Sequence, residues 1–148
     1  MTQKAARHLD AQTEARIRES FASQTLMATF GASVTSISPG SCAISAPILP
    51  GARQQHGAGH AGLTFALGDT AAGYAALSLM PEGREVMTVE MKVNLLAPAL
   101  GERLVASGRV VKSGKRLTVV TAEVEAVTGE EWRLVALLQG TMIPVDTV

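Results

Sequence analysis

Apolar and polar positions recur with two different periods along this chain, and the changes of period divide it into elements. Over residues 13–30, Ile17, Phe21 and Met27 fall close to one helical face, which predicts a short amphipathic helix. Residues 1–12 are polar, so we expect a frayed tail there. Residues 30–51 then contain two strand-like runs joined by a Pro-Gly dipeptide, which predicts a hairpin.

The longest apolar stretch, residues 60–80, predicts a buried helix that Pro81 ends, because proline cannot continue a helix. Asp69, several glycines and hydroxyl side chains make this stretch costly to place in a membrane, so a core helix is favoured. Small side chains around the carboxylate indicate either a closely packed sheet or open space for a ligand. The residues on the face of Asp69 are Gly62, Phe65, Ala66, Ala72, Gly73 and Ala76.

Four strand-like runs follow without another helix, at residues 86–97, 102–113, 116–127 and 131–143. Short turns separate them, as expected of antiparallel neighbours. The first run alternates regularly, which predicts one polar and one apolar face; its polar members are Thr88, Glu90, Lys92 and Asn94 and its apolar members Val89, Met91, Val93 and Leu95. The element order predicts one α+β domain over residues 1–148, in which an antiparallel sheet covers the apolar helix.

Composition narrows the possible functions. Lys and Arg total 13 and Asp and Glu total 13, so the net charge of zero argues against nucleic-acid binding. The first residues lack an apolar signal-peptide core, and the only cysteine, Cys42, cannot form an internal disulfide, which together indicate the cytoplasm. We interpret Cys42 as a small hydrophobic residue on a strand, in preference to a redox or nucleophilic group.

The candidate chemistry lies in the loop before the long helix and on the helix itself. A buried carboxylate such as Asp69 is either hydrogen-bonded structurally or placed to act on a substrate. The first amides of the helix, at Ala61 and Gly62, lack helical partners and are ready donors to an oxyanion, and Gln54 can point to the same place. His60 suits either backbone bonding or acid–base work. The histidines show no metal-ligand spacing, so no metal site is expected.

These residues resemble a known family. Gln54-x-x-Gly57-x-x-His60-Ala61-Gly62, with Asp69 nine positions after the histidine, resembles the Asn/Gln-x-x-Gly-x-x-His-Gly-Gly motif and helix acid of hotdog-fold acyl-CoA thioesterases related to the phenylacetate-degradation thioesterase. Residues 20–32 and 88–124 are also similar to that subfamily. The likeness extends over about residues 17–143, and it implies a sheet of about five or six strands wrapped around the helix at about residues 60–80. It also implies homodimers paired edge to edge, and homotetramers.

The resemblance implies metal-free hydrolysis of an acyl-CoA, with coenzyme A as part of the substrate and no other cofactor. Asp69 would be the general base or the nucleophile, and the Ala61 amide would bind the thioester oxygen. Gln54 would orient the carbonyl or the water, and His60 would shape the turn. Ala61 stands where the family has glycine, which keeps the amide but adds a methyl group beside the substrate.

The same resemblance assigns weaker contacts to the substrate. Gly57 and Gly62 would line the site, and Thr88 would complete it from the partner subunit. A polar turn either meets the CoA phosphates or is simply solvated; its residues are Lys112, Ser113, Gly114, Lys115 and Arg116.

The resemblance leaves two other functions on this fold. A non-catalytic acyl-CoA binder or sensor is the alternative, but it has no need for an acid such as Asp69. A hydratase is disfavoured, because Tyr74 stands five residues after Asp69 where hydratase-type hotdog proteins have histidine. We expect neither nucleic acid nor a membrane as a partner.

Overall fold

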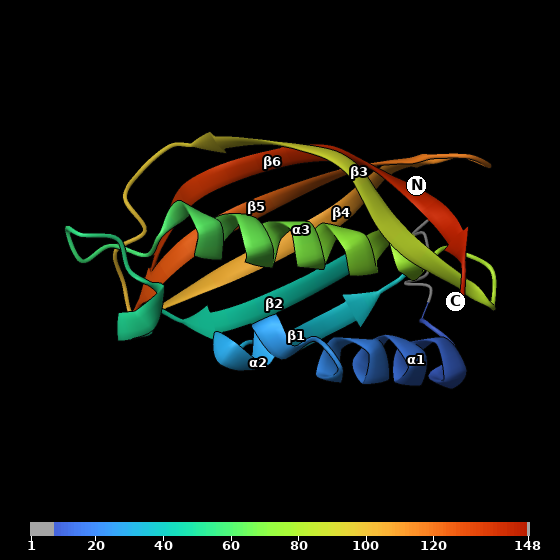
Figure 1. The fold of residues 1–148 in the computed structure, drawn as a ribbon, viewed down its shortest axis with the longest axis horizontal. Helices are drawn as coiled ribbons and strands as arrows, with labels where there is room; N and C mark the ends of the chain where they lie inside the picture. Colours follow the sequence, from blue (N-terminus) through green and yellow to red (C-terminus); the bar gives the residue numbers. More distant parts are fainter. Residues whose placement is uncertain (1–7, 148) are drawn as a thin grey trace, which may run out of the picture.

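The computed structural model describes residues 8–147, so residues 1–7 of the expected tail lie outside the described part. One antiparallel sheet of six strands, in the order β1-β2-β4-β5-β6-β3, curls around a single long helix (Figure 1). The elements are α1 (Ala11–Ala22), α2 (Thr25–Thr29), β1 (Ser33–Ser38), β2 (Ser41–Pro47), a 3-10 turn (Pro50–Ala52), α3 (Ala61–Leu77), β3 (Arg84–Leu95), β4 (Arg103–Ser113), β5 (Thr118–Thr128) and β6 (Glu131–Asp146).

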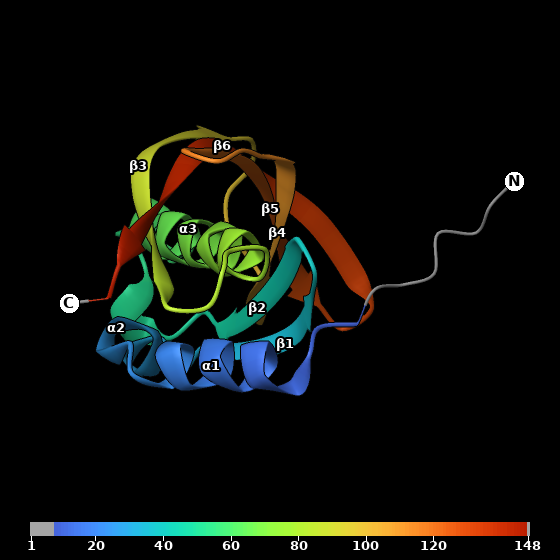
Figure 2. The same cartoon turned by 90° about the vertical axis from the view of Figure 1, so that its right-hand side faces the viewer.

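The predicted α+β architecture is confirmed. Viewed along α3, the sheet bends around the helix, and α1 lies outside this roll beside β1 and β2 (Figure 2). The predicted hairpin is also present, since β1 pairs with β2 across a turn in which Gly40 has a φ of +76°. That backbone conformation is open to glycine at little cost, which explains the Pro-Gly dipeptide at the turn.

The N-terminal helix differs from its prediction, because residues 13–30 form two helices and not one. α1 begins at Ala11, since the carboxylate of Asp10 accepts a hydrogen bond from the Thr13 amide at 2.8 Å and caps the helix. It ends where the Ser23 hydroxyl donates back to the Glu19 carbonyl at 3.0 Å, and α2 starts two residues later. Ile17 is buried in the core, as its place on the apolar face predicts.

α3 is shorter than predicted, because it ends at Leu77 before proline can act on it. The Ser78 hydroxyl donates to the Ala75 carbonyl at 2.7 Å and accepts from the Gly40 amide at 2.7 Å. These bonds tie the end of the helix to the β1–β2 turn. The 17 residues of α3 are buried along most of their length, and they form the axis of the hydrophobic core.

Small residues allow the backbone of the sheet to approach the backbone of α3 closely. A Cβ atom built on Gly108 of β4 would lie 2.4 Å from the carbonyl carbon of Ala71 and 2.4 Å from the amide nitrogen of Ala72. A Cβ atom on Gly68 of α3 would lie 2.8 Å from the side chain of Leu138. Of the two interpretations of the small side chains, close packing therefore holds for this side of the helix.

β3 does not keep the simple alternation that its sequence predicts. The pairing of β3 with β6 shifts register between Thr88 and Glu90, which is the signature of a β-bulge at Val89. Thr88 consequently points to α3, whereas Glu90 points away and accepts a hydrogen bond from Thr141 at 2.7 Å. The prediction that Thr88 and Glu90 share one polar face is wrong, because the extra residue turns Thr88 inward.

Candidate active site

Asp69 lies in the middle of α3, partly buried, and faces the bulge of β3. The Thr88 hydroxyl donates a hydrogen bond to Oδ1 of the carboxylate at 2.8 Å. Burial raises the pKa of Asp69, and the bond from Thr88 works in the opposite direction by stabilising the charged form. One carboxylate oxygen is thus fixed, and Oδ2 is left for a water molecule or a substrate carbon.

Thr88 lies in the same chain as the carboxylate that it contacts. The bulge is the physical reason for this contact, because without it the side chain would point to the outer face of the sheet. That Thr88 completes a site together with residues of a partner subunit stays a prediction.

A hollow of about 190 Å³ opens beside Asp69 and Thr88. Besides these two residues, it is lined by Ser20, Gln24, Thr70, Gly73, Tyr74, Glu85 and Val86. Gln24 Nε2 donates to the Tyr74 hydroxyl at 2.7 Å, and Ser20 Oγ lies 3.1 Å from the same hydroxyl. No local pattern in the sequence marks these residues, because the N-terminal helices meet α3 only in the folded chain.

The start of α3 is capped by His60. Its Nδ1 accepts a hydrogen bond from the Gly62 amide at 2.8 Å, so a neutral imidazole carries its proton on Nε2. A Cβ atom on Gly62 would lie 2.9 Å from that nitrogen, which explains the glycine. The Gly62 amide is therefore engaged, and the Ala61 amide is the one that has no hydrogen-bond partner in the described first turn.

Gln54 and Gly57 form the loop that leads into the helix. The Gln54 side-chain oxygen accepts a hydrogen bond from the His56 amide, which leaves the side-chain NH₂ group to donate elsewhere. Gly57 has a φ of +88° and donates its amide to the Gln54 carbonyl at 3.0 Å, so its role here is the turn itself. Gln54 and Ala61 line a second hollow of about 410 Å³, which Gly57 does not line.

The two hollows have no residue in common. Asp69 follows Ala61 by eight residues, which is about 12 Å along the helix axis. A single thioester group cannot contact both the Ala61 amide and the Asp69 carboxylate of one chain.

The polar turn at residues 112–116 connects β4 to β5, and all five of its residues are exposed. The Gly114 amide donates to the Leu117 carbonyl at 2.9 Å, which closes the turn. Strand register places it at the same end of the sheet as Thr88, because Thr118 and Thr88 both pair with Met142.

Several other features bear on the chemistry. Cys42 lies on β2 with 1% of its surface exposed, and burial raises its pKa to about 12. Within residues 8–147, no group of three or more His, Cys, Asp or Glu side chains is arranged to hold a metal ion. No helix of the described part is long and apolar enough to cross a membrane.

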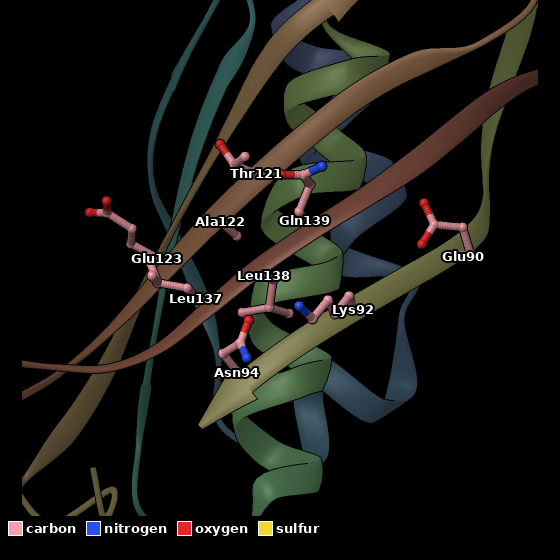
Figure 3. A pocket seen from close by; sticks show the side chains of 9 residues that line it. All are labelled: Glu90, Lys92, Asn94, Thr121, Ala122, Glu123, Leu137, Leu138 and Gln139. Carbon is pink, nitrogen blue, oxygen red and sulfur yellow. The ribbon is translucent and has the colours of Figure 1, made fainter. Parts of the chain in front are cut away.

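A further hollow of about 500 Å³ lies on the outer face of β3, β5 and β6, with α3 on the opposite side of the sheet (Figure 3). Its polar lining includes Glu90, Lys92 and Gln139. None of the candidate catalytic residues lines it.

An open antiparallel sheet wrapped around one helix is the hotdog fold. Residues 56–132 match the family model of the thioesterase superfamily. A candidate esterase of Halobacterium salinarum is 35% identical over 109 residues, which cover 70% of each chain. The chain therefore belongs to the thioesterase superfamily, a class of hydrolases.

Solved structures support this assignment. A thioesterase family protein from Silicibacter pomeroyi is 42% identical, with a TM-score of 0.89 over 91% of this chain and 99% of that one. The Escherichia coli PaaI protein from the phenylacetic acid degradation operon has a TM-score of 0.82 over 95% of this chain and 98% of its own. At 21% identity, that second likeness shows the shared fold alone.

Proposed function

We propose that this protein hydrolyses an acyl-CoA thioester to the free acid and coenzyme A, with no metal ion and no further cofactor. The observation that carries the proposal is Asp69, a partly buried carboxylate held by Thr88 beside a hollow in a thioesterase-superfamily fold. A protein that only binds or senses acyl-CoA needs no such acid at the thioester. A cytoplasmic location accords with this substrate.

The proposed reaction begins at the free Oδ2 of Asp69. The carboxylate either takes a proton from water as that water attacks the thioester carbon, or attacks the carbon itself to form an anhydride that water then cleaves. The Ala61 amide donates to the oxygen that becomes negatively charged, and the Gln54 NH₂ group orients the carbonyl or the water. Collapse of the intermediate breaks the C–S bond, and the CoA thiolate leaves and takes up a proton.

We place each active site between two copies of the chain, with Asp69 and Thr88 from one and Gln54, His60 and Ala61 from the other. The separation of Asp69 and Ala61 supports this arrangement. Among the described residues, β3 is the last strand of the sheet and pairs only with β6, so its outer edge is open to a second β3. A homotetramer would then form through the outer faces of two such dimers.

The polar turn completes the proposed substrate contacts. Lys112, Lys115 and Arg116 are exposed at the sheet end where Thr88 lies, so their charges suit the phosphates of CoA. The direct test of the whole proposal is release of CoA thiol from short-chain, medium-chain and aryl acyl-CoAs. Tight binding of these compounds without any release would favour the binding alternative.

Replacing Ala61 with Pro tests the oxyanion donor without breaking the helix. Proline is tolerated at the first position of a helix, and His60 before it already has the extended φ of −63° and ψ of 144° that a following proline requires. The substitution removes only the amide N–H, and we expect kcat to fall about 10²-fold. Ala61→Gly, which keeps the amide, is the matched control and should retain turnover.

Mixing two inactive variants tests whether the site is shared. A dimer of one Ala61→Pro chain and one Asp69→Asn chain has one site with both defects and one intact site. Random reassortment should therefore restore about a quarter of the native activity. If both groups acted within one chain, no mixed dimer would have an intact site, and the mixture would stay inactive.

The acid limb of the pH profile of kcat/KM should report the ionisation of Asp69. Turnover needs the carboxylate, so kcat/KM should rise with pH through an apparent pKa above the ordinary value for aspartate, because burial raises it. Thr88→Val removes the hydrogen bond that lowers this pKa, so the limb should move to higher pH. Thr88→Ser keeps a hydroxyl and should leave the limb near its native position; identical profiles for Val and Ser would contradict the role of Thr88.

A further inference from the structure

The hollow beside Asp69 has a chemical character that points to a substrate class, on the premise of the proposed thioester hydrolysis. We propose that it receives a short acyl group carrying a hydrogen-bond donor, a hydroxyl or an ammonium, and that it rejects acyl groups ending in a carboxylate. The specificity-determining residues are Gln24 and Glu85, with Tyr74 as the group that positions Gln24.

The first argument is the orientation of Gln24. Its Nε2 donates to the Tyr74 hydroxyl at 2.7 Å, so its Oε1 is the atom of the amide that remains to accept a hydrogen bond. Tyr74 is 3% exposed and its ring meets that of Phe21 edge to face at 6.1 Å, which fixes the hydroxyl in place. A ligand that reaches Oε1 of Gln24 therefore meets an acceptor, and the second N–H of Nε2 is left as a donor, a combination that a ligand hydroxyl can satisfy.

Charge is the second argument. Asp69 and Glu85 both line the hollow, and none of the lining residues that this chain supplies is a Lys, Arg or His. The Glu85 carboxylate has no ion-pair partner among the described residues. Its charge acts on the Tyr74 hydroxyl, since Glu85 is one of the groups that raise the pKa of Tyr74, after burial as the main cause. An acyl carboxylate would be repelled here, and an ammonium attracted.

Size limits the acyl chain. The hollow measures about 190 Å³, below the range of roughly 300–1,000 Å³ typical of pockets for drug-sized ligands. α1 closes one side of the hollow. Its Ser20 contacts Tyr74, and its Ile17 is fully buried three residues earlier. The part of the site that one chain encloses therefore holds an acyl group of a few carbon atoms and is too small for a long aliphatic chain.

The test compares five substrates of matched chemistry: propanoyl-CoA, 3-hydroxypropanoyl-CoA, 3-aminopropanoyl-CoA, succinyl-CoA and decanoyl-CoA. We expect kcat/KM for the hydroxy and amino compounds to exceed that for propanoyl-CoA by about tenfold, because each satisfies an acceptor that propanoyl leaves unpaired. Succinyl-CoA and decanoyl-CoA should each be at least about tenfold poorer than propanoyl-CoA.

The Glu85→Gln variant tests whether the Glu85 carboxylate causes the preference for the amino compound. It removes the charge at nearly constant shape, so the amino-to-propanoyl ratio should fall about tenfold, and the deficit of succinyl-CoA should shrink. Gln24→Leu should lower the hydroxy-to-propanoyl ratio in the same way. Glu123→Gln, on the outer face of β5 (Figure 3), is the matched control and should leave every ratio unchanged.

The outcomes separate this inference from the proposed function. Turnover of propanoyl-CoA that equals or exceeds that of the hydroxy and amino compounds overturns the inference and leaves hydrolysis standing. Ratios that Glu85→Gln and Gln24→Leu do not change overturn it as well. Absence of CoA release from all five compounds overturns both.

Discussion

Asp69→Asn should lower the rate of CoA release about 10²–10⁴-fold at saturating substrate, the range expected when a general base is removed. Asparagine keeps the shape and can still accept the bond from Thr88, so the fold and the site geometry should persist. It can neither take a proton from water nor attack the thioester carbon. Asp69→Ala should be at least as slow, since it also leaves the Thr88 hydroxyl without its partner.

The measurement is thiol release under single-turnover and steady-state conditions, alongside substrate binding by the same variants. Asp146→Asn is the matched control, because that carboxylate is 88% exposed, pairs with Arg84 at 2.6 Å and does not line the hollow. The control should keep native turnover. An Asp69→Asn protein that releases CoA at the native rate would remove the catalytic role from Asp69 and return it to a structural one.

Gly108→Ala should destabilise the protein by about 3–5 kcal/mol, a large effect for a single methyl group. The added Cβ would lie 2.4–2.5 Å from backbone atoms of Ala71 and Ala72, and backbone atoms cannot rotate out of the way as a side chain can. β4 or α3 would have to move, in the part of the core where both are buried. The loss should appear as a lower denaturant midpoint with an unchanged slope.

Gly51→Ala is the matched control for this substitution. Nothing lies within 4 Å of a Cβ atom at that position, and its φ is outside the range that favours glycine. Its stability should stay within about 0.5 kcal/mol of the native protein, as for other surface changes. Equal stability of the two variants would show that the sheet and the helix are not in backbone contact at Gly108.

Most helices and strands can be predicted from the sequence, because the residue patterns that mark them are local. Pro39-Gly40 marks a turn by its own backbone preferences, and the period of two marks each strand wherever the pairing is regular. The bulge at Val89 has no such signal, since it is defined by how β3 pairs with β6. A single extra residue there reverses the direction of Thr88, and period counting cannot detect it.

The residues of the candidate site differ in the same way, because some are marked by local sequence patterns and others are not. The loop and helix spacing is visible in the sequence, so Gln54, His60, Ala61 and Asp69 could be singled out. The residues alone do not show which amide at the start of the helix remains free, because the His60 side chain determines this by accepting a bond from the Gly62 amide. Ser20, Gln24 and Tyr74 meet only through the packing of α1 and α2 on α3, at sequence separations of 50 or more.

The burial of Cys42 makes the protein a convenient subject for the assay that its proposed reaction requires. With the thiol 1% exposed and its pKa raised to about 12, very little of the reactive thiolate form is present at pH 8. An electrophilic thiol dye added to the folded protein should therefore record sulfur that comes from the substrate, and no second cysteine is present to interfere. Progress curves can be followed continuously, with no mutation of the enzyme and no correction for its own sulfhydryl group.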